Sequence, residues 1–145
     1  MSWLEQLFGP PTNWDQAILV ALASYALGCV AGGYYLVRMR TGRDMRAIGS
    51  GSVGARNVSC VLGKWGFMAT LLWDVAKGAA VVWAVRRFSA DERLVALALL
   101  MVVIGHIWPV QLRFHGGKGV ATSLGGLLIY DWQLVIAYGM IFLGP

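Results

Sequence analysis

Two short glycine-rich segments carry most of the side chains that could do chemistry. The first glycine segment, GSGSVGARN, runs from Gly49 to Asn57, and the second glycine segment, HGGKG, runs from His115 to Gly119. Glycines let backbone N–H groups converge on an anion, and serine, arginine and lysine side chains add further donors. We therefore expect two sites for phosphate groups. The alternative for both segments is a flexible, basic connection between helices.

The first glycine segment also matches the G-x-G-x-x-G pattern through Gly49, Gly51 and Gly54. A dinucleotide-binding fold would need a strand before this pattern and a βαβ unit around it, whereas long apolar stretches flank it here. We reject nucleotide binding and keep the local interpretation, an anion site. Its side-chain donors would be Ser50, Ser52, Arg56 and Asn57.

The second glycine segment places Lys118 next to Gly116 and Gly117, before the start of an apolar stretch. It lacks the spacing of a Walker A loop. A cation among exposed amides at the start of a helix still favours an anion. The alternative is that Lys118 only anchors the chain at the membrane surface.

A charged pair, Asp74 and Lys77, lies inside an apolar stretch with three-residue spacing, so both residues share one helix face. Each costs about 2.5–3.5 kcal/mol at a bilayer centre, which predicts that the pair faces the protein interior. The alternative is a purely structural ion pair. His106, near the end of another apolar stretch, is either a base or donor, or a buried packing residue.

The composition requires membrane helices to position these residues. The 145 residues are 58% hydrophobic and only 13% charged, with a mean hydropathy of +0.64. That composition excludes an ordinary soluble domain. Three stretches are long enough to cross a bilayer: Ala17–Val37, Gly66–Val85 and Leu94–Leu112. We predict an all-α, polytopic transmembrane helix bundle.

Two further apolar runs, Gly119–Tyr130 and Leu134–Leu143, are each too short to cross, and Asp131 to Gln133 between them indicates an interfacial turn. One alternative is that the two runs form a single long segment with an interruption. The other, which we favour, is that the chain ends inside its last membrane element. Cys29 and Cys60 have neither metal-ligand nor disulfide-framework spacing. No metal and no dissociable cofactor is implied.

The basic residues predict the orientation. No Lys or Arg precedes Ala17, whereas six basic residues and one acid separate the first two spans. The positive-inside rule puts this connection and both glycine segments in the cytoplasm and the N-terminus outside. The same rule explains the net charge of +5 without invoking nucleic acid.

Three motifs resemble the bacterial, acyl-phosphate-dependent glycerol-3-phosphate acyltransferases of the plasma membrane: IGSGSVGARNVSCVLGKWG, LLWDVAKG and GHIWPVQLRFHGGKGVAT. The resemblance runs from the first span to about Leu128. Family members usually read G-S-G-N-x-G-A-T-N-x-x-R in the first motif. Here Ser52 stands at the Asn, Arg56 at the Thr, and Cys60 at the final Arg, which is expected to hold substrate phosphate. Arg56, one helical turn earlier, is the candidate replacement.

The resemblance implies acyl transfer from acyl phosphate to the sn-1 hydroxyl of glycerol 3-phosphate, giving lysophosphatidate for phospholipid biosynthesis. Both substrates carry phosphate, which suits two anion sites, and an activated donor needs no nucleophile from the enzyme. None is visible, because the chain has no G-x-S-x-G elbow and no thiol beside a histidine. The expected catalytic residues are Lys118, Ser50 and His106. The expected substrate-binding residues are Gly49, Gly51, Ser52, Gly54, Arg56, Asn57, Asp74, Lys77, Gly116 and Gly117.

We expect residues 1–145 to be a single transmembrane acyltransferase domain that lacks the family's C-terminal spans. Its expected place is the bacterial inner membrane, and its expected partners are the two substrates and membrane lipids, with protein partners undetermined. Two alternatives remain open. One is a non-catalytic membrane relative, and the other is a small protein that binds or transports phosphate or lipid phosphate.

Overall fold

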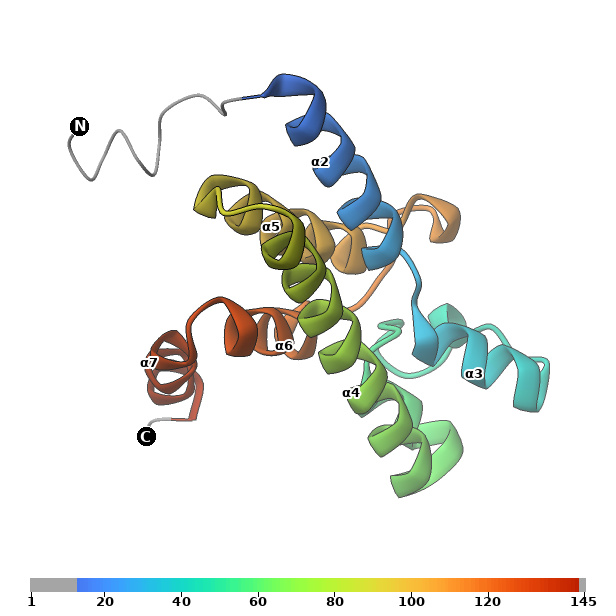
Figure 1. Ribbon diagram of the computed structural model, residues 1–145. Coiled ribbons are helices and arrows are strands. Elements are labelled where there is room, and N and C mark those ends of the chain that lie inside the picture. Colours follow the sequence, from blue (N-terminus) through green and yellow to red (C-terminus); the bar gives the residue numbers. More distant parts are fainter. Residues whose placement is uncertain (1–12, 144–145) are drawn as a thin grey trace.

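The computed structural model describes residues 13–143, which are helical with short connections and contain no strand. Residues 1–12, which carry the predicted outward N-terminus, lie outside the described range. In chain order the helices and 3-10 turns are α2 (Trp14–Gly28), α3 (Gly32–Thr41), η1 (Met45–Ala47), α4 (Ala55–Phe88), α5 (Glu92–Ile107), η2 (Val110–Leu112), α6 (Val120–Tyr130) and α7 (Trp132–Leu143) (Figure 1). The predicted all-α class is confirmed.

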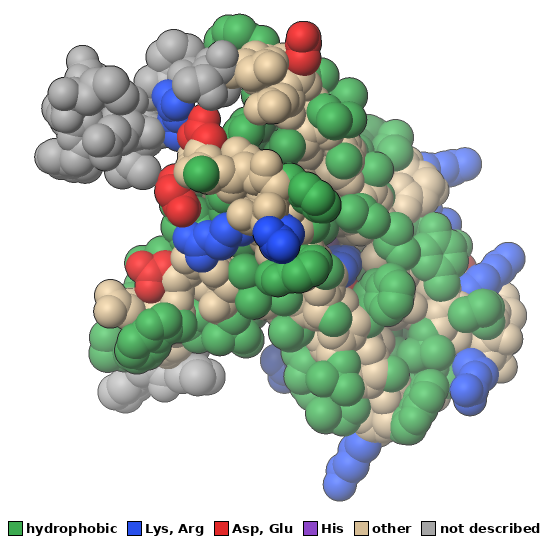
Figure 2. All heavy atoms as spheres, in the orientation of Figure 1, with side chains coloured by type: hydrophobic (Ala, Val, Ile, Leu, Met, Phe, Trp, Pro, Cys, Tyr) green, Lys and Arg blue, Asp and Glu red, His purple; other side chains and the backbone are tan. Residues whose placement is uncertain are grey.

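Three segments are long and apolar enough to cross a membrane: Trp14–Thr41, Ala55–Phe88 and Glu92–Leu112. Large apolar side chains such as Leu19 and Leu72 point outward from them and are 68% and 61% exposed. Figure 2 shows hydrophobic side chains over much of one face, with basic side chains at its right-hand and lower edges and a further group of basic and acidic side chains at the left of the view. This surface suits a hydrocarbon solvent, and the chain is a multi-pass membrane protein.

The first predicted span, residues 17–37, lies within one candidate membrane segment, Trp14–Thr41, but this segment consists of two helices. α2 ends at Gly28, residues 29–31 are not helical, and α3 begins at Gly32. A Cβ on Gly28 would collide with the Val102 carbonyl of α5, and one on Gly33 would collide with the Val53 carbonyl. α2 therefore packs on α5 backbone to backbone, while α3 turns away toward the first glycine segment (Figure 1).

α4 is longer than the predicted span over residues 66–85, and it is interrupted near its start. Gly63 has φ 66° and ψ −159°, outside the helical region, so residues 55–62 form a separate short arm before the main helix. Only glycine adopts such angles readily. This arm carries Arg56, Asn57 and Cys60, and the main helix carries Asp74 and Lys77.

The third predicted span, residues 94–112, ends as a regular helix at Ile107. Pro109 follows, and a proline cannot continue the helical hydrogen bonds. Arg113 and Phe114 then take positive φ values of 54° and 62°, which turn the chain back. As a result the Gly117 N–H donates to the His106 carbonyl at 3.1 Å.

The two short apolar runs form two helices, α6 and α7, that meet at Asp131 (Figure 1). Asp131 is extended and its carboxylate accepts from the Gln133 N–H at 2.9 Å, so it caps α7. The predicted turn is thus confirmed at Asp131 but is shorter than expected, because Trp132 and Gln133 already belong to α7. Its place at the membrane interface stays a prediction.

Candidate functional site

One cavity of about 740 Å³ lies where the first glycine segment, α4, the end of α5 and the start of α6 meet. Its polar lining comes mainly from residues that the sequence indicated: Gly49, Ser50, Ser52, Gly54, Arg56, Asn57, Asp74, His106 and Lys118. Its apolar lining comes from α4 and α6: Phe67, Leu71, Val120, Ala121 and Leu124. The cavity therefore has the polarity of a phosphate joined to a hydrocarbon chain.

The first glycine segment forms a turn whose shape depends on glycine. Gly49 and Gly51 have φ values of 55° and 73°, which side-chain-bearing residues rarely adopt. The Gly51 N–H donates to the Ile48 carbonyl at 3.0 Å. The segment is also joined to the second glycine segment, because the Val53 N–H donates to the Gly116 carbonyl at 3.3 Å.

Asn57 holds this turn closed from within. Its Nδ2 donates to the carbonyls of Ile48 and Ser52 at 2.9 and 2.8 Å, and its Oδ1 accepts from the Ser50 N–H at 3.2 Å. The residue is buried, with 5% of its surface exposed. Asn57 lines the cavity, as expected for a substrate contact, but its amide already bonds to the loop, so its evident role is to shape the anion site.

The second glycine segment lies tightly against the end of α5. A Cβ on Gly116 would meet the carbonyls of His106 and Ile107, and one on Gly117 would meet the His106 ring. These glycines let the segment pass close enough to put Lys118 in the cavity lining, one residue before the Gly119 cap of α6. The first N–H groups of α6 have no acceptor within the helix. The Lys118 ammonium and the N-terminus of α6 would therefore both attract an anion bound at this place.

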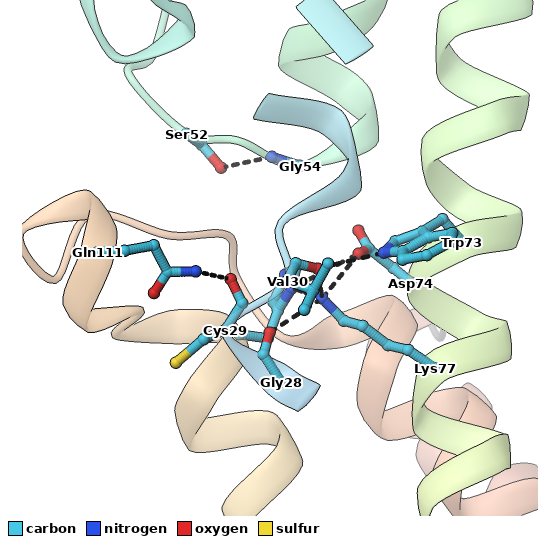
Figure 3. Close-up of polar contacts among 10 residues, drawn as sticks. Gly28, Cys29, Val30, Ser52, Gly54, Trp73, Asp74, Lys77 and Gln111 are labelled. Carbon is cyan, nitrogen blue, oxygen red and sulfur yellow. Dashed lines mark hydrogen bonds and ion pairs between the residues drawn. The ribbon is translucent and has the colours of Figure 1, made fainter. Parts of the chain in front are cut away.

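Lys77 is the centre of a buried polar cluster. Its Nζ lies 3.1 Å from Asp74 Oδ1 and 2.7 Å from His106 Nδ1, and all three side chains are at most 9% exposed. The same ammonium donates to the carbonyls of Gly28 and Val30 at 3.2 and 3.1 Å. Figure 3 shows Lys77 reaching from α4 to the break between α2 and α3.

The break exposes backbone carbonyls that would be costly without partners in a membrane. Trp73 Nε1 donates to the Val30 carbonyl at 3.2 Å, and the Gln111 side chain donates to the Cys29 carbonyl (Figure 3). Together with Lys77, these side chains satisfy the three carbonyls at the end of α2. The charged pair thus faces the interior, as its spacing predicted.

Arg46, in the connection between α3 and α4, links this connection to the end of η2. Its guanidinium pairs with Asp44 at 2.6 Å and donates to the Leu112 carbonyl at 3.1 Å. The hydrogen bonds from Arg46 lower the pKa of Asp44 from 3.8 to about 2, so the carboxylate stays ionised at neutral pH. This contact holds the connections that carry the two glycine segments against each other.

The structure separates the predicted site residues into two groups. Gly51, Lys77, Gly116 and Gly117 lie outside the cavity lining and support the residues that line it, whereas the remaining ones line it directly. The roles of all of them in binding or catalysis stay predictions. No group of three metal-ligating side chains occurs among residues 13–143.

The sequence did not indicate the apolar lining. Phe67, Leu71 and Leu124 look like any other lipid-facing or packing residues in an apolar helix, and only the contact of α4 with α6 assigns them to a cavity. Cys60 also lines the cavity, where the family pattern has an arginine.

Comparisons with known proteins agree with this geometry. The family model described as glycerol-3-phosphate acyltransferase matches residues 18–144. A glycerol-3-phosphate acyltransferase 1 from Desulfitobacterium hafniense is 44% identical over 126 residues, which cover 87% of this chain and 62% of that protein. One from Bacillus cereus is 42% identical over 125 residues, covering 86% and 69%. This chain thus spans about two thirds of their length.

Two solved structures are also similar. Both are crystal structures of PlsY, an integral membrane glycerol 3-phosphate acyltransferase. The glycerol 3-phosphate form superposes with a TM-score of 0.77 at 34% identity, over 88% of this chain and 64% of that one. The lysophosphatidic acid form gives 0.73 at 31% identity, over 88% and 63%.

Proposed function

Because this chain belongs to the glycerol-3-phosphate acyltransferase family, we propose that it transfers an acyl group from acyl phosphate to the sn-1 hydroxyl of glycerol 3-phosphate. The product, lysophosphatidate, would enter phospholipid biosynthesis. The observation that supports this most is the cavity in which the first glycine segment and Lys118 of the second meet an apolar wall from α4 and α6. Solved relatives are described in forms with glycerol 3-phosphate and with lysophosphatidic acid, which are an acceptor and a product of this kind.

The two ends of the cavity suit the two parts of an acyl phosphate. Phosphate would lie among Ser50, Ser52 and Lys118, and the acyl chain would lie along Phe67, Leu71 and Leu124 toward the bilayer. Burying the chain against apolar side chains is favourable, at about 0.8 kcal/mol for each CH₂ group. A soluble phosphate ester alone would gain nothing from that wall, so its presence supports a lipid-like substrate.

The chemistry needs positioning and charge stabilisation more than a nucleophile. The acceptor hydroxyl attacks the acyl carbon, the C–O bond to phosphate breaks, and inorganic phosphate leaves carrying the proton that the hydroxyl gives up. Negative charge develops on the carbonyl oxygen and on the leaving phosphate. Lys118, which lies in the cavity lining, would stabilise that charge. His106 and Ser50, in the same lining, are the other catalytic candidates.

Arg56 is the proposed replacement for the family's arginine. Cys60 takes that arginine's position, and a thiol cannot hold a phosphate by charge. Arg56 lies one helical turn earlier on the same arm of α4, and both residues line the cavity. A guanidinium at this place can still form a bidentate pair with phosphate.

We further propose that residues 1–145 act as one acyltransferase domain in the bacterial inner membrane, with both glycine segments in the cytoplasm and the N-terminus outside. The basic residues between the first two spans support this orientation. The acyl phosphate donor would reach the cavity from the cytoplasmic side.

Acyl transfer by the purified protein tests the function. The chain is reconstituted in liposomes with palmitoyl phosphate and radiolabelled glycerol 3-phosphate, and lysophosphatidate is measured. A fusion that adds the part of the Bacillus cereus relative outside the matched region is assayed in parallel. We expect product from acyl phosphate and none when glycerol 3-phosphate is omitted. Binding of both substrates without product in the chain and the fusion would favour the non-catalytic alternative.

A further inference from the structure

The hydrogen bonds of Lys77 account for every proton that its ammonium carries. An ammonium group has three N–H donors and no acceptor. Its three hydrogen-bond partners are the carbonyls of Gly28 and Val30 and the ring nitrogen Nδ1 of His106, at 3.2, 3.1 and 2.7 Å. Two of these partners can only accept. The third N–H is therefore directed at His106 Nδ1.

Asp74 supplies the opposite charge without taking one of these protons. Its Oδ1 lies 3.1 Å from Lys77 Nζ, yet within the described residues this atom meets no donor in hydrogen-bonding geometry. It also lies 3.5 Å from His106 Nδ1. Asp74 Oδ1 can therefore still accept a hydrogen bond, and it lies near the His106 Nδ1 atom to which Lys77 donates.

This arrangement fixes where His106 carries its proton. A neutral imidazole has one N–H and one bare nitrogen, and the bare nitrogen is the one that accepts. Because Nδ1 accepts from Lys77, the proton must be on Nε2. The Nε2 edge of the ring lies against Gly117, next to Lys118, and His106 belongs to the cavity lining.

We propose that Lys77 is a positioning residue that holds His106 as its Nε2–H tautomer, so that the ring offers the cavity a hydrogen-bond donor. The oxygens of a phosphate and of an acyl carbonyl only accept, so this tautomer suits them and the other does not. That last step depends on the proposed function, whereas the tautomer itself is measurable without substrate.

Without Lys77, we expect the proton of the neutral His106 ring to move from Nε2 to Nδ1. In Lys77→Met the Nδ1 atom loses its donor, and the neighbouring Asp74 carboxylate becomes the strongest acceptor within reach. The ring then gives its proton to Nδ1 and turns a bare Nε2 toward the cavity. The same substitution removes a donor from the Gly28 and Val30 carbonyls at the break, and only Val30 keeps another, from Trp73. A structural role and the positioning role therefore need separate readouts.

Nitrogen NMR distinguishes the tautomers. In protein labelled with ¹⁵N-histidine, and carrying His115→Gln to leave one histidine, long-range proton–nitrogen correlations assign the protonated nitrogen of His106. We expect Nε2 to be protonated and Nδ1 bare at neutral pH, without substrate. A protonated Nδ1, or an even mixture of both forms, in the otherwise unchanged protein would overturn the proposal without any Lys77 variant.

Two variants then test the part played by Lys77. We expect Lys77→Met to move the proton to Nδ1 and to lower kcat by about 10-fold or more, the loss of one aligned donor. Lys64→Met, which removes an exposed lysine from the same helix, should leave the spectrum unchanged. An Nε2–H tautomer that persists in folded Lys77→Met would refute the role of Lys77. If the tautomer moves but neither protein transfers acyl groups, only the proposed function fails.

Discussion

Gly78 of α4 lies directly against the Thr122 backbone of α6, with no room for a side chain between them. A Cβ on Gly78 would collide with the Thr122 carbonyl, and one on Gly125 would collide with the Val75 carbonyl. Small residues let two membrane helices approach this closely, and α4 and α6 are the most extensively packed pair of helices among the described residues. This contact brings Asp74 on α4 and Lys118, before α6, to one cavity.

Replacing Gly78 by alanine should separate α4 from α6. Overpacking of this kind costs about 1–3 kcal/mol, so we expect a lower thermal unfolding temperature in detergent and weaker substrate binding. Gly139→Ala in α7 is the matched control, since nothing lies within 4 Å of a Cβ at that position. Equal unfolding temperatures for the two variants would show that the close contact is not needed.

Arg56→Ala should weaken binding of the phosphate-bearing acceptor. Losing one charged hydrogen bond of about 1.5–3 kcal/mol raises the KM for glycerol 3-phosphate by roughly 10- to 100-fold. The same change should be milder when Cys60→Arg restores the family's arginine. Arg43→Ala, on an exposed residue outside the cavity lining, is the control. An unchanged KM in Arg56→Ala would leave Arg56 as a topology residue.

Asp44 makes a pH-dependent contribution to stability. Because Arg46 lowers the pKa of Asp44 from 3.8 to about 2, its stabilisation is complete above pH 4 or so and is lost as the pH falls toward 2. Asp44→Asn should therefore lower the stability at pH 7 by up to about 1 kcal/mol, the usual range for an exposed pair. Thermal unfolding curves of the variant and the unchanged protein should converge near pH 2. A constant difference across this range would mean that the ion pair is not the cause.

The orientation can be read from single cysteines. In protein without Cys29 and Cys60, a cysteine at Ser2 should react with an impermeant thiol reagent in intact cells, because the N-terminus is expected outside. A cysteine at Ser52 should react only after the cells are permeabilised. The reverse pattern would invert the topology and place both glycine segments outside the cell.

The sequence predicted well the features that depend on local physics. Glycines mark the turn in the first glycine segment, because residues with a side chain rarely adopt the positive φ values seen at Gly49 and Gly51. The apolar lengths marked the spans, and the cost of charge in a membrane predicted that Asp74 and Lys77 face inward. These inferences need no knowledge of which helices are neighbours.

The break in the first span and its partners could not be predicted in this way. No proline or charge interrupts residues 17–37, and Gly28, at which α2 ends, lies directly against the backbone of α5. The carbonyls left open are then capped by Lys77 and Gln111, which lie 49 and 82 residues away from their acceptors in the chain. Tertiary contacts of this kind leave no periodic signal in the sequence.

The turnover of Lys118→Met shows whether Lys118 takes part in acyl transfer. Lys118 is exposed in the cavity lining, where its ammonium can meet phosphate as a compact charge. Removing a contact that strengthens in the transition state should cost about 2–4 kcal/mol, or roughly 30- to 1000-fold in kcat. Lys118→Arg should recover little of this loss, because the planar guanidinium cannot occupy the same point.

The assay compares acyl transfer from palmitoyl phosphate by the unchanged protein, Lys118→Met and the control Lys64→Met. Each is tested as the chain alone and as the fusion with the unmatched part of the Bacillus cereus relative. We predict normal membrane insertion for all three, near-normal turnover for Lys64→Met, and nearly abolished turnover for Lys118→Met. Full turnover by Lys118→Met would contradict the account and leave the second glycine segment as a basic anchor at the membrane surface.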